Sequence, residues 1–140
     1  MLDQIRIKKE YPYPPDRIWF ALTDTTALEK WFLPNDFVAE VGSTFTFRDK
    51  PAPGFDGIIR GEVLTSDPPE RLVYTWRGGS IATEVEFNLS LTTTGGTLLH
   101  LEHRGFSGLV NKLMVRNILA LGWRRNLLGR RLPAYLADHA

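Results

Sequence analysis

A change in apolar periodicity late in the chain restricts its fold more than any other feature. From Asp36 to Arg104, apolar and polar side chains alternate in successive stretches, which is the pattern of half-buried β-strands. The pairs Pro68-Pro69, Gly78-Gly79 and Gly95-Gly96 separate these stretches and predict turns. Because each predicted strand has one apolar and one polar face, we expect an antiparallel sheet with one side open to solvent.

The tail of the chain is predicted to form one long helix that covers the dry face of this sheet. At 3.6 residues per turn its apolar residues fall within one stripe: Met114, Ile118, Leu121, Leu128, Leu132, Tyr135 and Leu136. Most of its basic residues lie off the stripe: Lys112, Arg116, Arg124, Arg130 and Arg131. Arg125 projects into the stripe. Gly129 and Pro133 predict an uneven helix, because an interior proline removes a hydrogen bond.

The N-terminal region predicts a strand followed by two short helices. Ile5 and Ile7 alternate with basic residues, and the prolines from Pro12 onward end the strand. Pro15 suits the first turn of a helix, and Thr23 or Asp24 suits the cap of a second one, which ends before Pro34. We therefore predict one α+β domain over residues 1–140, in which a curved antiparallel sheet wraps around a long C-terminal helix.

Composition excludes several classes of protein. Apolar residues make up 43% of the chain and charged residues 24%, as in ordinary globular proteins. The formal net charge of +1 gives no general drive toward nucleic acid, and the longest apolar run is too short to span a bilayer. The first residues carry charges where a signal peptide needs an apolar segment, so we expect a cytoplasmic location. We also expect a monomer without stable membrane insertion.

The sequence supplies no arrangement that predicts catalysis, a metal or a cofactor. The chain has no cysteine and no glycine-rich phosphate loop. Gly105-Phe106-Ser107-Gly108 has the wrong glycine spacing for a nucleophile elbow. His100 and Glu102 share one face of their predicted strand while His103 points to the other, which argues against a shared metal.

Several stretches together resemble the activator-of-Hsp90-ATPase-homologue-1-like (AHSA1-like) branch of the START/Bet v 1 superfamily. They are PPDRIWFALTDTTALEKWF, VGSTFTF, GEVLTSDPPERLVYTW, GTLLHLEHRGF and Gly122-Trp123, in the order the family has them. The chain departs from the family at Ser43, where a second glycine is usual, and at Arg130, where an apolar residue is usual. The resemblance implies the helix-grip fold and an apolar cavity between the sheet and the last helix.

The resemblance, together with strand parity, implies a set of cavity-lining residues. They are Trp31, Phe32, Phe45, Phe47, Tyr74, Trp76, Phe87, Leu99, Leu101, His103, Phe106, Trp123, Arg125 and Leu128. His103 is expected to be either a hydrogen-bonded core histidine or a polar contact for a ligand. Arg125 either buries only its methylene groups or anchors a ligand carboxylate. The basic helix is either a solvated face or a docking site for an anionic surface or acidic partner.

The function predicted first is non-catalytic binding of a small apolar or amphipathic molecule, lipid-like, polyketide-like or aromatic, without a cofactor. The first alternative is a co-chaperone-like module that binds Hsp90 or another protein through its surface. The second alternative is a cyclase or hydrolase acting on an apolar substrate, with His103 and Tyr74 as a proton-transfer pair. The three classes differ in where a partner would contact the protein: inside the cavity, on the surface, or at a reacting pair.

Overall fold

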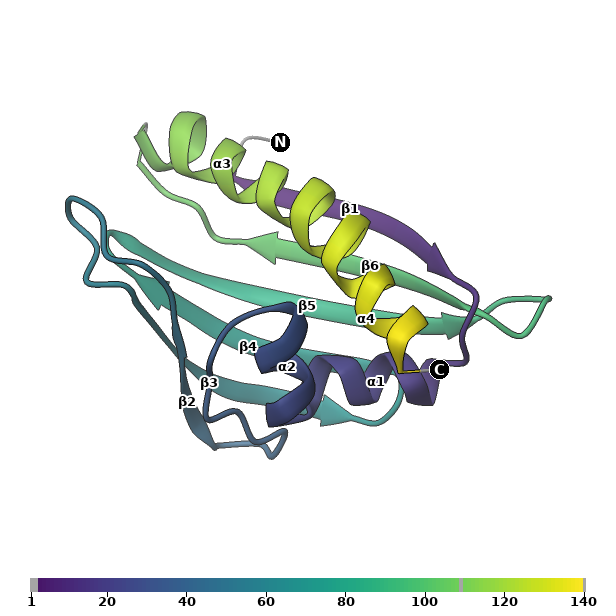
Figure 1. Ribbon diagram of the computed structural model, residues 1–140. Helices are drawn as coiled ribbons and strands as arrows, with labels where there is room; N and C mark the ends of the chain where they lie inside the picture. Colours follow the sequence, from purple (N-terminus) through teal and green to yellow (C-terminus); the bar gives the residue numbers. More distant parts are fainter. Residues whose placement is uncertain (1–2, 109, 140) are drawn as a thin grey trace.

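A computed structural model describes residues 3–108 and 110–139 and shows one six-stranded antiparallel sheet (Figure 1). The order of its strands is β1-β6-β5-β4-β3-β2, so the first strand lies beside the last. The strands are β1 Gln4–Tyr11, β2 Thr44–Arg48, β3 Ile58–Asp67, β4 Arg71–Gly78, β5 Ile81–Leu91 and β6 Thr97–Arg104. In β6 the odd-numbered residues are all buried and the even-numbered ones half-buried, as alternation predicts. The predicted α+β class with an antiparallel sheet is confirmed.

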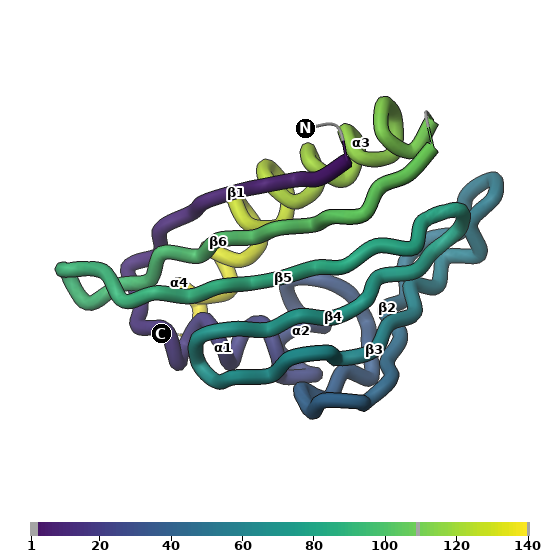
Figure 2. Tube along the Cα trace, turned by 180° about the vertical axis from the view of Figure 1, so that it is seen from behind, coloured from purple at the N-terminus to yellow at the C-terminus, as the bar shows by residue number. Residues whose placement is uncertain are grey.

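The two predicted short helices follow β1, as α1 Pro15–Thr23 and α2 Thr25–Trp31. The side chain of Asp24 caps α2 by accepting a hydrogen bond from the backbone N–H of Ala27 at 3.0 Å. The indole Nε1–H of Trp31 donates to the carbonyl of Ala21 at 2.7 Å and ties the two helices together. Seen from behind, the sheet lies in front of all the helices, so they cover one face only (Figure 2).

The C-terminal helix is continuous but changes its pitch along its length. Its segments are η1 Asn111–Val115, α3 Arg116–Leu121, η2 Gly122–Arg131 and α4 Leu132–Asp138, where η1 and η2 are π-helical. Wider π turns separate the buried residues Trp123 and Leu128 by five positions instead of three or four. Pitch changes of this kind are the unevenness that Gly129 and Pro133 predicted.

The predicted apolar stripe is wrong in the first half of this helix. Met114, Ile118 and Leu121 were expected to face the sheet, but they are 60%, 65% and 53% exposed. The side chains that are buried in their place are Ala120 and Trp123. The reason is the π turns, which rotate the helix relative to a uniform period of 3.6 residues.

Two features favour the π segment. Pro133 has no N–H to offer to the carbonyl of Leu128 five residues earlier, and the hydroxyl of Tyr11 donates to that carbonyl at 2.7 Å instead. At Gly129, a Cβ atom would clash with the carbonyl oxygen of Arg124. The helix thus needs a glycine at one point and a hydroxyl from β1 at another.

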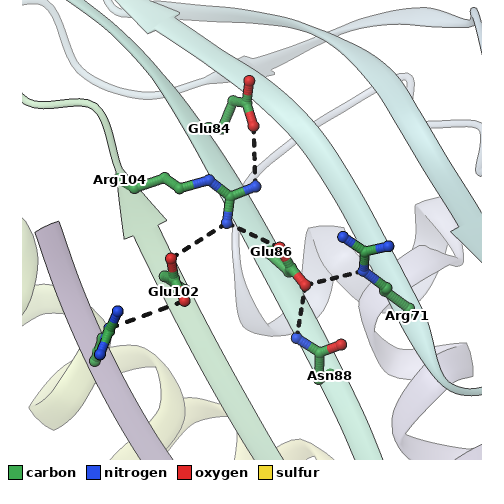
Figure 3. A network of polar contacts seen from close by, with 7 residues as sticks. Arg71, Glu84, Glu86, Asn88, Glu102 and Arg104 are labelled. Carbon is green, nitrogen blue, oxygen red and sulfur yellow. Dashed lines mark hydrogen bonds and ion pairs between the residues drawn. The ribbon is translucent and has the colours of Figure 1, made fainter.

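The solvent face of the sheet carries a network of ion pairs (Figure 3). Arg104 bonds Glu84, Glu86 and Glu102 at 3.0, 2.8 and 3.4 Å, and Arg71 bonds Glu86 at 2.9 Å. Burial alone would raise the pKa of Glu86, but the hydrogen bonds from Arg71, its neighbour Asn88 and Arg104 lower it to about 2. This region of the face is therefore occupied by paired charges.

In the described part of the chain, the helices are too short or too polar to cross a lipid bilayer.

Candidate functional site

All but one of the predicted cavity residues lie in the core between the sheet and the helices. Trp31, Phe32, Phe45, Phe47, Tyr74, Trp76, Phe87, Leu99, Leu101, His103, Phe106, Trp123 and Leu128 are each at most 5% exposed. Arg125 is the exception, and its predicted inward position is wrong. It is exposed because the π turn directs Trp123 and Leu128, not Arg125, toward the sheet.

The aromatic residues of this core pack against one another and fill the space between sheet and helix. Phe32 stacks on Trp123 with ring centroids 5.6 Å apart and an angle of 19° between planes. Phe32 also meets Phe47 edge-on at 5.0 Å, and Trp76 lies 5.7 Å from Trp123. Distances and tilts of this kind are those of favourable aromatic pairs in a solid core.

His103 joins the sheet to the helix through a chain of hydrogen bonds. Its Nε2 lies 2.7 Å from the hydroxyl of Thr83, which itself donates to the carbonyl of Trp76 at 3.1 Å. Because that hydroxyl donates its only hydrogen to the carbonyl, Nε2 of His103 carries the proton and Nδ1 is an acceptor. The indole Nε1–H of Trp123 donates to this Nδ1 at 3.1 Å. Both ring nitrogens are thus used inside the protein.

The surroundings of His103 keep it neutral. The side chain is fully buried, and this burial lowers its pKa to about 3. No buried side-chain nitrogen or oxygen in residues 3–108 and 110–139 lacks a hydrogen-bond partner. Of the two roles predicted for His103, the geometry supports the hydrogen-bonded core histidine.

One open groove lies beside this core, along one flank of the C-terminal helix. The groove encloses about 610 Å³. Its helix side consists of Val115, Ile118, Leu119, Gly122 and Leu127. The facing wall consists of the loop 52–55 and the β4–β5 turn, with residues 78–81. Phe32, Ile59 and Trp76 also line it, so part of its lining is the aromatic cluster of the core.

Gly122 contributes to this groove by lacking a side chain. Its backbone is helical, with φ −59° and ψ −50°, so no unusual conformation requires glycine there. A Cβ atom at this position would meet no heavy atom within 4 Å. Glycine inside a helix costs roughly 1 kcal/mol relative to alanine. At Gly129 the nearby carbonyl requires a glycine in spite of this cost. At Gly122 there is no such contact, and the missing side chain leaves the groove open.

Two charged residues also line the mainly apolar groove, Arg131 from the helix and Asp49 from the end of β2. Within the described chain, Arg131 makes no ion pair with a carboxylate. An unpaired guanidinium beside an apolar surface can bind the acidic end of an amphipathic molecule.

The sequence pattern predicted the floor of the groove but not its walls. Phe32 and Trp76 are among the residues predicted to line a cavity, whereas Phe55, in the loop 52–55, is not. The signal in the sequence for this wall of the groove is a phenylalanine within a loop rich in glycine and proline. The sequence marks Gly122 only through the family resemblance, because whether this glycine opens a groove depends on the helix register.

Comparisons with known proteins agree with this architecture. Residues 12–137 match the family described as "Activator of Hsp90 ATPase homolog 1-like protein". A comparison with curated proteins found no match.

Among solved structures, protein MLL2253 from Mesorhizobium loti is 26% identical, with a TM-score of 0.86 and 98% of each chain covered. CalU16 from Micromonospora echinospora is 28% identical, with a TM-score of 0.77, over 97% of this chain and 77% of its own. PFC0360w from Plasmodium falciparum, titled an HSP90 activator, is 23% identical with a TM-score of 0.78, and 96% of each chain is covered. At this identity the last likeness shows a shared fold alone.

Proposed function

The chain belongs to the Activator of Hsp90 ATPase homolog 1-like family, and we propose that it binds a small apolar or amphipathic molecule in the groove beside its C-terminal helix. The observation that carries this proposal is the open groove at Gly122. Its volume of about 610 Å³ lies within the range of small-molecule pockets, roughly 300–1,000 Å³. The proposal moves the binding site from the interior, where aromatic side chains are packed, to the flank of the helix.

We further propose that the molecule carries an acidic group, which Arg131 binds. Arg131 lies in the groove lining together with apolar residues such as Leu127 and Phe55. A linear amphiphile fits this arrangement, because its chain would cover the apolar walls while its carboxylate meets the guanidinium. Arg125, for which a carboxylate anchor was one of two predicted roles, does not line the groove.

Thermal denaturation with dodecanoic acid and dodecanol as probes tests the site. Binding to the folded protein raises the melting temperature by linkage, so both probes are expected to stabilise the parent protein. Gly122→Leu fills the groove and is expected to weaken binding of both by tenfold or more. Asn117→Leu is the matched control, since it adds the same side chain at an exposed helix position outside the groove. Equal stabilisation of the parent and Gly122→Leu would place the ligand elsewhere.

The role of Arg131 is tested with its neighbour as the control. Arg131→Gln is expected to weaken the binding of dodecanoic acid about tenfold and to leave the binding of dodecanol unchanged. This change corresponds to the loss of a charge-assisted hydrogen bond of about 1.4 kcal/mol. Arg130→Gln removes the same charge from an exposed position that does not line the groove. If both variants weaken the binding of dodecanoic acid equally, the effect is due to net charge and the assignment of Arg131 as the anchor is wrong.

A co-chaperone-like role is the second candidate. The family description supports it, and the Plasmodium falciparum protein titled an HSP90 activator has the same fold. The measurement that separates it from ligand binding is the ATPase rate of purified Hsp90 with and without the protein. Stimulation that survives Gly122→Leu would assign the role to the surface, and no stimulation would argue against it.

A further inference from the structure

The first half of the C-terminal helix presents an apolar face to solvent, which we call the outer helix face. Its residues are Val110, Leu113, Met114, Ile118 and Leu121, each at least 44% exposed. They recur mostly at intervals of three or four positions and therefore lie along one side of the helix. Ala120 and Trp123, on the opposite side, are buried toward the sheet. Five large aliphatic side chains gathered on one exposed helix face mark an interaction surface.

Positive charge accompanies this face along the helix without any acid in the same stretch of chain. Residues 105–137 contain six lysine or arginine residues and no aspartate or glutamate. By contrast, residues 1–104 hold fifteen of the sixteen acidic side chains of the chain. Arg125 is exposed four residues after Leu121 and Arg124 is exposed beside it, so cationic side chains follow the outer helix face along the helix. The outward side of the helix therefore carries both aliphatic and cationic residues.

These features fit an anionic lipid surface better than a protein. A second copy of the chain would bring two uncompensated basic helices together, which is electrostatically unfavourable. Protein interfaces are usually anchored by aromatic residues in pockets. The outer helix face instead offers flexible aliphatic side chains from one helix. Such a face, flanked by arginine, is typical of helices that lie in the plane of a membrane interface.

We propose that the outer helix face docks peripherally on anionic lipid bilayers. Val110, Met114, Ile118 and Leu121 insert into the boundary between headgroups and acyl chains, while Arg124 and Arg125 contact lipid phosphates. The segment from residue 110 to 121 spans about 18 Å as a helix, shorter than a bilayer core, so it lies on the membrane and does not cross it. Ile118 lies at the edge that the outer helix face shares with the groove, so Met114 and Leu121, which do not line the groove, test this face separately.

Co-sedimentation of the full chain with vesicles tests this proposal. The vesicles contain phosphatidylcholine alone or with about 30% phosphatidylglycerol. Binding is expected only with the anionic vesicles and is expected to fall as salt rises from about 50 to about 500 mM, because screening weakens the arginine contacts. Equal binding to both compositions, or no binding to either, would overturn the proposal.

Matched variants separate the two contributions. Met114→Gln with Leu121→Gln is expected to weaken binding to anionic vesicles at least tenfold through lost insertion, and neither residue lines the groove. Leu91→Gln is the control, because Leu91 is 67% exposed, close to the 60% of Met114, but lies at the end of β5, away from the helix. Arg124→Gln with Arg125→Gln is expected to weaken binding roughly 25-fold, about fivefold for each charge near the surface.

Circular dichroism checks that each variant is folded, which is expected because all four substituted helix positions are exposed. Sedimentation velocity identifies the competing occupant. If the parent protein is a dimer that Met114→Gln converts to a monomer, the outer helix face is a self-association surface and the membrane proposal is wrong. The membrane proposal is also wrong if the glutamine variants of the helix bind anionic vesicles as tightly as Leu91→Gln does.

Discussion

The neutral, fully buried His103 predicts a specific loss of stability in mild acid. The pKa of this imidazole is about 3 in the folded protein, against 6.5 for an ordinary histidine. In the unfolded chain the ring takes up a proton below pH 6.5, while the folded protein keeps it neutral. Acid therefore favours the unfolded chain. The stability due to neutral His103 is complete above pH 6.5 and is lost as the pH falls from 6.5 toward 3.

The size of this effect follows from linkage. Each pH unit below 6.5 costs about 1.4 kcal/mol, so His103 removes about 2 kcal/mol from the free energy of unfolding between pH 8 and pH 5. At pH 5 the size of this loss depends little on the pKa of His103 in the folded protein, provided that this pKa lies below about 4. Glu86, with a pKa near 2, loses its contribution only at lower pH. The interval from pH 8 to pH 5 thus isolates the histidine from the ion-pair network.

Urea denaturation at constant ionic strength, followed by tryptophan fluorescence, measures this loss. His103→Gln retains an amide that can donate and accept hydrogen bonds but does not titrate, so its free energy of unfolding is expected to lose about 2 kcal/mol less than that of the parent over the same interval. His100→Gln, on the solvent side of the same strand, is the control and is expected to keep the parent's pH dependence. If His103→Gln and the parent lose equal stability between pH 8 and pH 5, the buried neutral imidazole is refuted.

Three further predictions concern the C-terminal helix, each measured by urea denaturation at pH 8. Tyr11→Phe leaves the Leu128 carbonyl without its hydroxyl donor and is expected to cost about 1–3 kcal/mol. Gly129→Ala places a methyl group against the Arg124 carbonyl and is expected to cost about 1–3 kcal/mol, with loss of the π turn visible in chemical shifts. Gly122→Ala meets open space and is expected to stabilise the protein by up to about 1 kcal/mol, so destabilisation there would contradict the helix register described above.

The sheet was predictable because alternation is a local signal. In β5 and β6, every second residue must face the helices, and a slip of one position would expose Phe87 or Leu101 together with all their neighbours on the same face. Asp24, the cap of α2, and Pro15, in the first turn of α1, are also local signals, because each acts on the residues next to it in the chain. Leu91, in contrast, continues the alternation yet is exposed, because it is the last residue of β5 and lies beyond Asn88, where the pairing with β4 ends.

The site was less predictable because parity tells which face a residue occupies and not whether a void lies in front of it. Phe47 and Phe87 point inward as predicted, yet they pack against other rings. Whether aromatic side chains fill a space or line it depends on how closely the helix approaches the sheet. That approach is a long-range property, set partly by the contacts of Trp123 with His103 and Phe32.

The register of the last helix decides where each possible activity lies. A uniform period of 3.6 residues would have buried Ile118 and Leu121 and turned Arg125 inward, whereas the five-residue step from Trp123 to Leu128 reverses these positions. That step requires a glycine at 129 and a donor for the Leu128 carbonyl, neither of which an apolar pattern records. The same rotation places Gly122 at the groove and exposes the outer helix face. A variant that restores an α-helical register should therefore change ligand binding and membrane docking together, which no substitution confined to either surface would do.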